Sequence, residues 1–534
     1  MMSARAPASF AAALLLAAAS PAVAEDTAHA GCSAPLIGAV PREIVERPVP
    51  LRPGVGNAHD VVTTPSKEAQ AFYDQGQNYL HGYVFIEAAR SFLQALRLDP
   101  QLAMAHLGLS RAYAGLGART EEKEAVAKAQ SLAEKATPRE QRRIALRAKQ
   151  LETTNATHAA YRKAIDDALA IDIGDVELWL VRGNAEEPFP AGRGQRGGVA
   201  STAFYRVALE VAPDNAAAHH YLTHSYEMIG QIDKALEHGA AYARLAPAIP
   251  HAHHMWGHDL RRVGRLDEAI AVFKKADALE KAYYAAEDVP AEYDWHHLHN
   301  LDLLATAYQH KGSMQMAETV MREIVGLPSQ NPDASPRHEL AQFLLERQRY
   351  EEALTAARVV GESKDSGDRA VSHALAGQAL LGLGRVEAAR EELAAALAEP
   401  EGAAVKRVVD PLRGALMLRS PEEAAEGRTL FEELCRTLRT TPGADAWIAA
   451  VFRMEWMGRA AREAGDWDLA DHLARQLLDH DPHYAGSHLA MALVAHQRGD
   501  KAAARASADT AVRLWRNADL DLPERQVMET LRQP

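Results

Sequence analysis

A doublet of histidines with a third histidine one helical turn later occurs twice in this chain, and the two copies start 34 residues apart. The copies are His219, His220 and His224, and His253, His254 and His258. A fixed period of about 20 to 50 residues is typical of solenoids, in which each repeat buries its apolar face by stacking on its neighbours. A period of about 34 residues fits a helix–turn–helix unit. The spacing therefore predicts a row of stacked helix pairs.

The composition favours helices and argues against a sheet. Ala, Leu, Glu and Arg are abundant among the 534 residues, and all four favour helices. No alternating run of β-branched residues extends beyond a few positions. The formal net charge is −13, whereas a nucleic-acid binder needs a basic stripe to displace counterions from phosphates. We therefore expect an all-α protein that does not bind nucleic acid.

Residues 1–24 are typical of a secretory signal peptide. An arginine precedes an apolar run over 10–19, and the small residues at 22–24 fit a cleavage site. The run is too short to span a membrane, so we expect an exported protein of the bacterial periplasm without a membrane span. The two cysteines are Cys32 and Cys435. The sequence leaves open whether Cys32 is lipidated, paired with Cys435, or neither.

Large and small residues alternate between positions 72 and 100 in a pattern that suits two packed helices, because small residues let the helices approach and large ones fill the gap. They are Phe72, Gly76, Tyr79, Ala88, Phe92, Ala95 and Pro100. On these residues the chain resembles tetratricopeptide-repeat (TPR) proteins, over most of residues 66–515. The resemblance implies a right-handed superhelical solenoid of helix–turn–helix repeats with a concave groove. It also implies a protein or peptide partner.

Breaks in this pattern divide the chain into segments. We expect a signal peptide over 1–24, an extended lead-in over 25–65, N-terminal helical repeats over 66–182, a Gly/Pro-rich loop over 183–200, a His-rich repeat segment over 201–330 and C-terminal repeats over 331–534. The unit that ends near Gly312 is about 14 residues longer than the others. We expect this insertion to cover the groove with Tyr283, Tyr284, Glu287 and Asp288.

The resemblance also assigns the histidines to faces of the repeat. In the family, positions 2, 5, 9, 12 and 13 of the first helix line the groove, counted so that the inter-helix glycine is position 15. His219 and His253 then occupy a packing position and are interpreted as structural. The spacing of four residues independently places the other two histidines of each copy on one helix face. The candidate metal ligands are His220, His224, His251, His254, His258, His299 and Asp302.

Two histidines four residues apart on a helix can bind one ion through imidazole nitrogens at about 2.0–2.1 Å. Sites rich in nitrogen and without thiolates suit zinc, copper, nickel or iron better than calcium. Glu227, Arg261 and Arg262 are candidate ligand-binding residues near these positions, because arginine binds carboxylates and phosphates well. His296 and His297 are interpreted as capping or solvated residues at a helix start.

The segments HHYLTH, PHAHHMWGH and HLHNL resemble a narrower group of exported bacterial repeat proteins with His-rich first helices and no settled activity. This chain has Asp302 where that group usually has a further histidine. Three functions stay open: a groove-binding protein with a transition-metal site, a metal-free interaction scaffold, and a metal-dependent enzyme. The enzyme is least favoured, because the sequence has no phosphate-binding loop, dinucleotide fingerprint or nucleophile elbow. The sequence indicates no partner identity and no oligomeric state.

Overall fold

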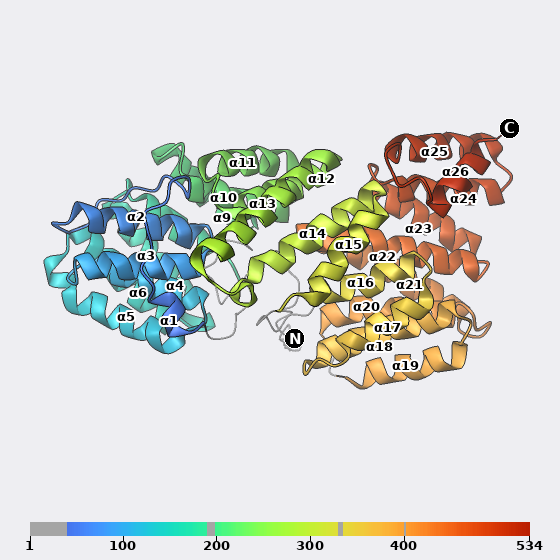
Figure 1. The fold of residues 1–534 in the computed structure, drawn as a ribbon, viewed down its shortest axis with the longest axis horizontal. Coiled ribbons are helices and arrows are strands. Elements are labelled where there is room, and N and C mark those ends of the chain that lie inside the picture. Colours follow the sequence, from blue (N-terminus) through green and yellow to red (C-terminus); the bar gives the residue numbers. More distant parts are fainter. Residues whose placement is uncertain (1–39, 189–197, 329–334, 400–401, 534) are drawn as a thin grey trace, which may run out of the picture.

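The computed structural model describes residues 40–533 apart from 189–197, 329–334 and 400–401. Within these ranges it contains 26 α-helices, three short 3-10 helices and no strand. Each helix packs mainly on the next one along the chain, in hairpins joined by short turns (Figure 1). This confirms the predicted architecture, an all-α solenoid of TPR type. The predicted signal peptide and Cys32 lie outside the described residues.

The predicted lead-in contains one short helix, α1 (Arg42–Val45), and the first part of the solenoid follows it. The helices of this part are α2 (Lys67–His81), α3 (Phe85–Leu98), α4 (Ala103–Gly115), α5 (Arg119–Leu132), η1 (Ala133–Lys135), α6 (Pro138–Glu152), η2 (Asn155–Thr157), α7 (His158–Ile171) and α8 (Val176–Asn184). The helix α6 begins with a capping box, in which Thr137 and Glu140 each bind the backbone of the other. Such a cap stabilises a helix start by satisfying its exposed N–H groups.

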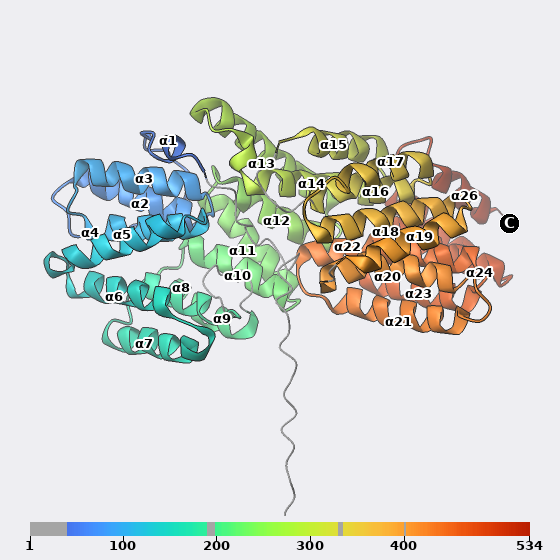
Figure 2. The ribbon, with the colours of Figure 1, turned by 90° about the horizontal axis from the view of Figure 1, so that it is seen from below.

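The His-rich part comes next and lies between the two ends of the molecule (Figures 1 and 2). Its helices are α9 (Gly198–Val211), α10 (Ala216–Met228), α11 (Ile232–Leu245), α12 (Pro250–Arg262), α13 (Leu266–Glu287), η3 (Ala291–Tyr293), α14 (Trp295–Lys311) and α15 (Met314–Gly326). The first half of the predicted insertion lengthens α13, and the second half forms the connection that contains η3. The end of α13 docks on the first part of the chain, because Glu287 binds Arg90 at 2.8 Å and Tyr283 donates to Glu87 at 3.0 Å.

The C-terminal part forms the right-hand half of Figure 1. Its helices are α16 (Ser335–Glu346), α17 (Tyr350–Val360), α18 (Ser366–Gly382), α19 (Val386–Ala398), α20 (Ala403–Met417), α21 (Ala424–Thr440), α22 (Ala444–Glu463), α23 (Trp467–His480), α24 (Ala485–Gln497), α25 (Lys501–Leu514) and α26 (Pro523–Arg532). Cys435 is buried in α21, with its sulfur 3.4 Å from the Met454 sulfur. None of the described helices is long and apolar enough to cross a membrane.

Most turns within the helix pairs place a glycine in the left-handed backbone region, which other residues adopt only at a steric cost. These glycines are Gly117, Gly230, Gly264, Gly312, Gly384, Gly465 and Gly499. Two other residues take the same place, Tyr83 with a φ of 60° and Gln348 with a φ of 57°. Only Tyr83 is buried.

Two large apolar cores meet in the His-rich part. The N-terminal core extends from Ile44 to Trp295, and the C-terminal core extends from Leu260 to Leu531. The helix α12 contributes Met255 to the first core and Leu260 to the second. The candidate histidines therefore lie where two packed bodies of helices join, and not along an isolated face.

Candidate metal centre

Seven histidines from α10, α12 and α14 form three groups of potential metal ligands. In each group, one ligand atom per residue lies within 4.8 Å of the others. We name them the inner group (His220, His224, His251), the middle group (His251, His254, His296) and the outer group (His254, His258, His299). No group in the described chain combines both predicted His–x3–His pairs. Instead, each His–x3–His pair is completed by a histidine near the start of the first helix of the following repeat.

The inner group has the dimensions of one face of a metal coordination shell. Its three Nε2 atoms are separated by 3.1 Å (His220 to His224), 3.1 Å (His220 to His251) and 3.4 Å (His224 to His251). Ligand nitrogens about 2.0–2.1 Å from a tetrahedral ion would be about 3.3 Å apart. All three side chains are buried, with exposed fractions of 0%, 3% and 2%. Three imidazoles therefore already stand at the spacing that an ion would require.

The outer group is similar but reaches the protein surface. The Nε2 atoms of His254 and His258 are 2.9 Å apart. The third member, His299, has its ring centroid 4.8 Å from that of His254 and keeps 19% of its side chain exposed. An ion bound here would have solvent on one side.

For two of the rings, the hydrogen-bond partners identify which nitrogen carries the proton. The Nδ1 of His220 is 2.7 Å from the His81 carbonyl oxygen, which can only accept, so Nδ1 donates. The Asn300 amide donates to the Phe273 carbonyl at 3.0 Å and turns its Oδ1 toward His254 Nδ1 at 3.1 Å. In a neutral ring, Nε2 is then left with its lone pair. Such outer hydrogen bonds orient metal-binding histidines.

Carboxylates lie beside three of the rings. His258 Nδ1 lies 3.3 Å from Glu227 Oε1, and His296 Nδ1 makes a short contact with Glu280. His299 Nε2 is 3.7 Å from Asp445 Oδ1. Carboxylate partners make an imidazole more basic toward a metal ion. They lie beside the middle and outer groups.

Burial keeps these imidazoles neutral. It lowers the pKa of His220 to about 3 and that of His296 to about 4. Burial, together with the neighbouring imidazoles, lowers the pKa values of His224, His251 and His254 well below the usual value. The physical cause is that a cation loses its hydration in the interior. Neutral imidazole is the form that binds metal.

The first histidine of each doublet has a structural role. His219 Nε2 is 3.2 Å from the Pro213 carbonyl oxygen, and His253 Nε2 is 2.9 Å from the Pro247 carbonyl oxygen. His488 makes the same contact, at 2.9 Å, with the carbonyl six residues before it. Each ring thereby satisfies a carbonyl at the end of the preceding helix pair. This agrees with the packing role predicted from the repeat.

Other segments of the chain fill the groove around the candidate residues. His81 at the end of α2 accepts from His220, and Ala248 donates to the Gly54 carbonyl at 2.8 Å. From the other end, Asp445 of α22 approaches His299. Because the N-terminal segment and α22 both contact the His-rich helices, most candidate ligands are buried. A partner cannot reach the inner group without moving these segments.

The remaining candidates lie at the edge of the cluster. Asp302 belongs to none of the three groups that the described residues form. It follows His299 by about one helical turn and is the main charge opposing the burial that lowers the pKa of Arg261 to about 9. The Arg261 guanidinium is buried and donates to Thr306 at 2.9 Å. Arg262 lies over the Trp447 ring at 5.3 Å from its centroid.

Sequence reasoning missed His296. It was interpreted as a cap or a solvated residue, but it is buried and belongs to the middle group. The cap is instead Asp294, whose side chain accepts from the His296 backbone. The helix α14 begins one turn earlier than the repeat pattern implies, which turns His296 inward. A capping aspartate two residues before a histidine was the available signal.

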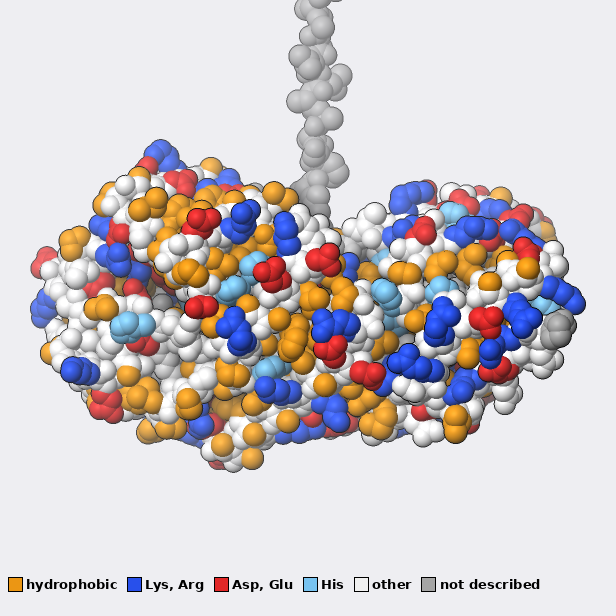
Figure 3. All heavy atoms as spheres, turned by 90° about the horizontal axis from the view of Figure 1, so that it is seen from above, with side chains coloured by type: hydrophobic (Ala, Val, Ile, Leu, Met, Phe, Trp, Pro, Cys, Tyr) orange, Lys and Arg blue, Asp and Glu red, His pale blue; other side chains and the backbone are white. Residues whose placement is uncertain are grey.

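On the face drawn in Figure 3, acidic and basic side chains are interspersed, and histidines appear at separate places rather than as one patch.

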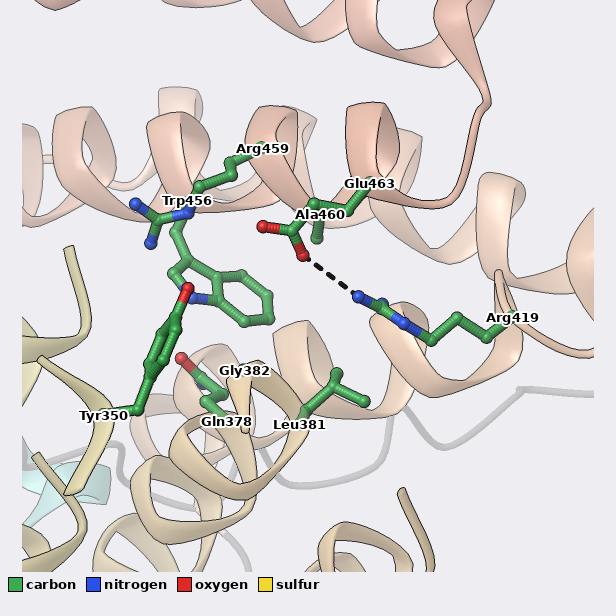
Figure 4. Close-up of a pocket in the computed structure, with 9 residues that line it drawn as sticks. All are labelled: Tyr350, Gln378, Leu381, Gly382, Arg419, Trp456, Arg459, Ala460 and Glu463. Carbon is green, nitrogen blue, oxygen red and sulfur yellow. Dashed lines mark hydrogen bonds and ion pairs between the residues drawn. The ribbon is translucent and has the colours of Figure 1, made fainter. Parts of the chain in front are cut away.

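A distinct cleft lies in the C-terminal part, where Trp456 and Tyr350 face each other (Figure 4). Its arginines are engaged, because Arg419 pairs with Glu463 at 3.0 Å and Arg459 donates to backbone carbonyls of α16. The cleft is therefore lined by two aromatic rings together with charged side chains that already have partners.

No protein-family model matches the chain, and no curated protein matches it in sequence. Solved structures that are similar to it include a tetratricopeptide repeat protein from Parabacteroides merdae, with 14% identity and a TM-score of 0.37 over 51% of this chain and 99% of that one. Yeast Tom70 has 13% identity and a TM-score of 0.35 over 87% and 96%. The human IFIT1 dimer has 13% identity and a TM-score of 0.34 over 86% and 92%. The architecture rests on the helix pairs and turns described above.

Proposed function

We propose that this protein is a TPR-type solenoid that binds a transition-metal ion through the histidine cluster at the junction of its two cores. The observation that carries the proposal is the inner group, in which three buried Nε2 atoms lie 3.1–3.4 Å apart. Neutral imidazoles cannot all satisfy one another at this spacing, because each remaining N–H can serve only one lone pair. A metal ion would accept all three lone pairs at once.

The ligand set narrows the identity of the ion. Zinc, copper, nickel and iron accept imidazole ligands, whereas magnesium and calcium prefer oxygen. The hydrogen bonds from His220 to the His81 carbonyl and from His254 to Asn300 supply the outer support that such sites use. From the signal peptide predicted over residues 1–24, we propose that the protein binds this ion in the bacterial periplasm.

The test uses the full chain with two substitutions, His251→Ala and His254→Ala, which together remove a ligand from each of the three groups. The matched control is His253→Ala, on the same helix but outside every group. The proteins are purified without chelator, analysed for metal content, and titrated with Zn²⁺, Cu²⁺, Ni²⁺ and Fe²⁺.

The wild-type protein and the control should hold at least one ion per chain, and the double variant none. The proposal fails if the wild-type protein neither contains nor takes up metal. It also fails if the double variant, with the helicity of the wild-type protein, takes up as much metal as the control. Circular dichroism on the same samples gives the helicity.

A second function, a protein-interaction scaffold that works without metal, is favoured by the aromatic cleft of Figure 4. Tryptophan and tyrosine are enriched where proteins bind partners, and Trp456 and Tyr350 both line this cleft. Co-purification of a protein that is lost on Trp456→Ala, and retained on His251→Ala with His254→Ala, would support this function. The reverse pattern would oppose it.

A further inference from the structure

The inner and outer groups share no residue, whereas the middle group takes His251 from one and His254 from the other. The three imidazoles of the inner group turn Nε2 toward one another, and His254 and His258 do the same in the outer group. A neutral imidazole serves one ion, so an ion in the middle group would compete for His251 with an ion in the inner group and for His254 with an ion in the outer group. The arrangement thus provides for two ions at the ends rather than for one central ion or for three.

The charges around the two terminal groups differ. His258 and His299 in the outer group lie beside the carboxylates of Glu227 and Asp445. In the inner group, His220 instead donates to a backbone carbonyl, that of His81. None of the hydrogen bonds or ion pairs of the inner imidazoles goes to a carboxylate within the described chain.

Arginines near the outer group do not cancel its negative charge. Arg261 and Arg262 interact with a larger set of carboxylates, namely Glu227, Asp302, Glu339, Asp445 and Asp481, whereas burial raises the pKa of Asp259 well above its usual value and favours its neutral form. A divalent ion bound to the outer group would therefore meet compensating charge. The exposed side of His299 would add water to its surroundings.

Aromatic rings enclose the inner group. Tyr83 places its ring centroid 4.6 Å from His220, 5.2 Å from His251 and 6.2 Å from His224. Tyr242 stacks on His220 at 4.7 Å. Tyr83 occupies the turn position that glycine takes in most other repeats, with a φ of 60°. A buried non-glycine residue in this conformation is a strained choice that often accompanies a functional site.

Resting on the proposed function, we infer that the cluster binds two ions of different charge: a divalent ion such as Zn²⁺ in the outer group and monovalent copper, Cu⁺, in the inner group. The cost of burying an ion in a medium of low polarity rises with the square of its charge, so a dication costs about four times as much as a monocation. The inner group offers three neutral nitrogens, aromatic walls and no carboxylate partner among the described residues. Cu⁺ accepts imidazole ligands, and the three Nε2 atoms, 3.1–3.4 Å apart, are close enough together to bind one ion without a fourth ligand.

The experiment titrates the full chain anaerobically with Zn²⁺ and with Cu⁺, the latter buffered by a colorimetric Cu⁺ chelator, separately and then together. Two single-group variants, His220→Ala for the inner group and His299→Ala for the outer group, are compared with His253→Ala. Copper X-ray absorption on the wild-type protein reports the number of nitrogen ligands and does not depend on whether the variants fold.

The wild-type protein should bind one Zn²⁺ and one Cu⁺ at the same time, with copper bound by three nitrogens. His220→Ala should lower Cu⁺ affinity at least 10-fold and leave Zn²⁺ binding unchanged, and His299→Ala should do the reverse. Competition of the two ions for a single site, or equal binding of two Zn²⁺ ions, would overturn this inference and leave the proposed function standing. Binding of no metal would overturn both.

Discussion

The Nε2 atoms of His220 and His251 lie 3.1 Å apart where α10 meets α12, although 31 residues separate them in the chain. His220 donates its Nδ1 proton to the His81 carbonyl, so its Nε2 carries a lone pair toward His251. The Nδ1 of His251 is itself buried without a hydrogen-bond partner among the described residues. Buried polar atoms are nearly always paired in folded proteins. This contact therefore joins His220 to a ring whose second nitrogen has no hydrogen-bond partner within the described chain.

The metal-free protein should lose stability as the pH falls below about 6.5. Five buried histidines have lowered pKa values in the folded protein, namely His220, His224, His251, His254 and His296. An unfolded histidine has a pKa of about 6.5, so the unfolded chain binds protons that the folded chain does not. At pH 5 this costs about 2 kcal/mol per histidine. Five such costs are comparable with the whole stability of a typical protein, about 5–15 kcal/mol.

We therefore expect cooperative loss of helicity between about pH 6 and pH 4, measured by circular dichroism on chelator-treated protein. Bound metal should move the midpoint to lower pH, because the ion competes with protons for the same nitrogens. Equal urea stability of the metal-free protein at pH 7 and pH 5 would contradict this prediction.

Adjacent histidines of α12 should respond differently to substitution. His253→Ala removes the hydrogen bond to the Pro247 carbonyl and should lower the free energy of unfolding by about 1–2 kcal/mol, without loss of metal. His254→Ala should abolish binding in the outer group. Urea unfolding and metal analysis on the same preparations check both outcomes. Loss of metal in the His253 variant would show that the repeat-packing role is incomplete.

Replacing Tyr83 with glycine should destabilise the protein even though it removes backbone strain. The left-handed conformation costs about 1–2 kcal/mol for a non-glycine residue, but loss of a buried aromatic side chain costs about 3–5 kcal/mol. The net loss should be about 2 kcal/mol. Gln348→Gly is the matched control, because Gln348 has a similar φ but an exposed side chain. The Gln348→Gly variant should gain about 1 kcal/mol in the free energy of unfolding, measured with urea. A gain in both variants would contradict the prediction that the Tyr83 ring stabilises the protein by packing.

The repeat architecture could be predicted because it depends on local spacing. The 34-residue recurrence and the inter-helix glycines predict where each helix pair lies. Counting back from Gly264 and Gly312 predicts that His251 and His299 lie beside the His–x3–His pair of the preceding repeat. These positions follow from the repeat numbering that the family resemblance implies, counted back from the inter-helix glycines, since every repeat uses the same geometry.

The closure of the cluster could not be predicted in this way. It depends on contacts between distant segments, such as the His81 carbonyl with His220 and Asp445 with His299. A repeat pattern carries information on neighbouring units and little on units that meet after several turns of the solenoid. His296 was missed for a local reason, because α14 starts one turn before the repeat.

The last prediction concerns Asn300, which orients a metal ligand without belonging to any group. It is fully buried, accepts from His254 Nδ1 at 3.1 Å and donates to the Phe273 carbonyl at 3.0 Å. Asn300→Leu keeps the volume but removes the acceptor, so the His254 proton is free to move to Nε2 and block ligation.

We expect metal affinity of the outer group to fall about 10- to 100-fold, as is typical when an outer hydrogen bond is lost, while the inner group keeps its affinity because its histidines do not contact Asn300. Gln75→Leu provides the control. Gln75 is also a buried amide, but it donates hydrogen bonds to the Pro50 carbonyl and to Ser91 and none to a residue of the histidine cluster. This variant should lower stability and leave both affinities unchanged in a competitive chelator titration. If Asn300→Leu also leaves them unchanged, the ring of His254 is held by packing alone and its tautomer does not depend on the amide.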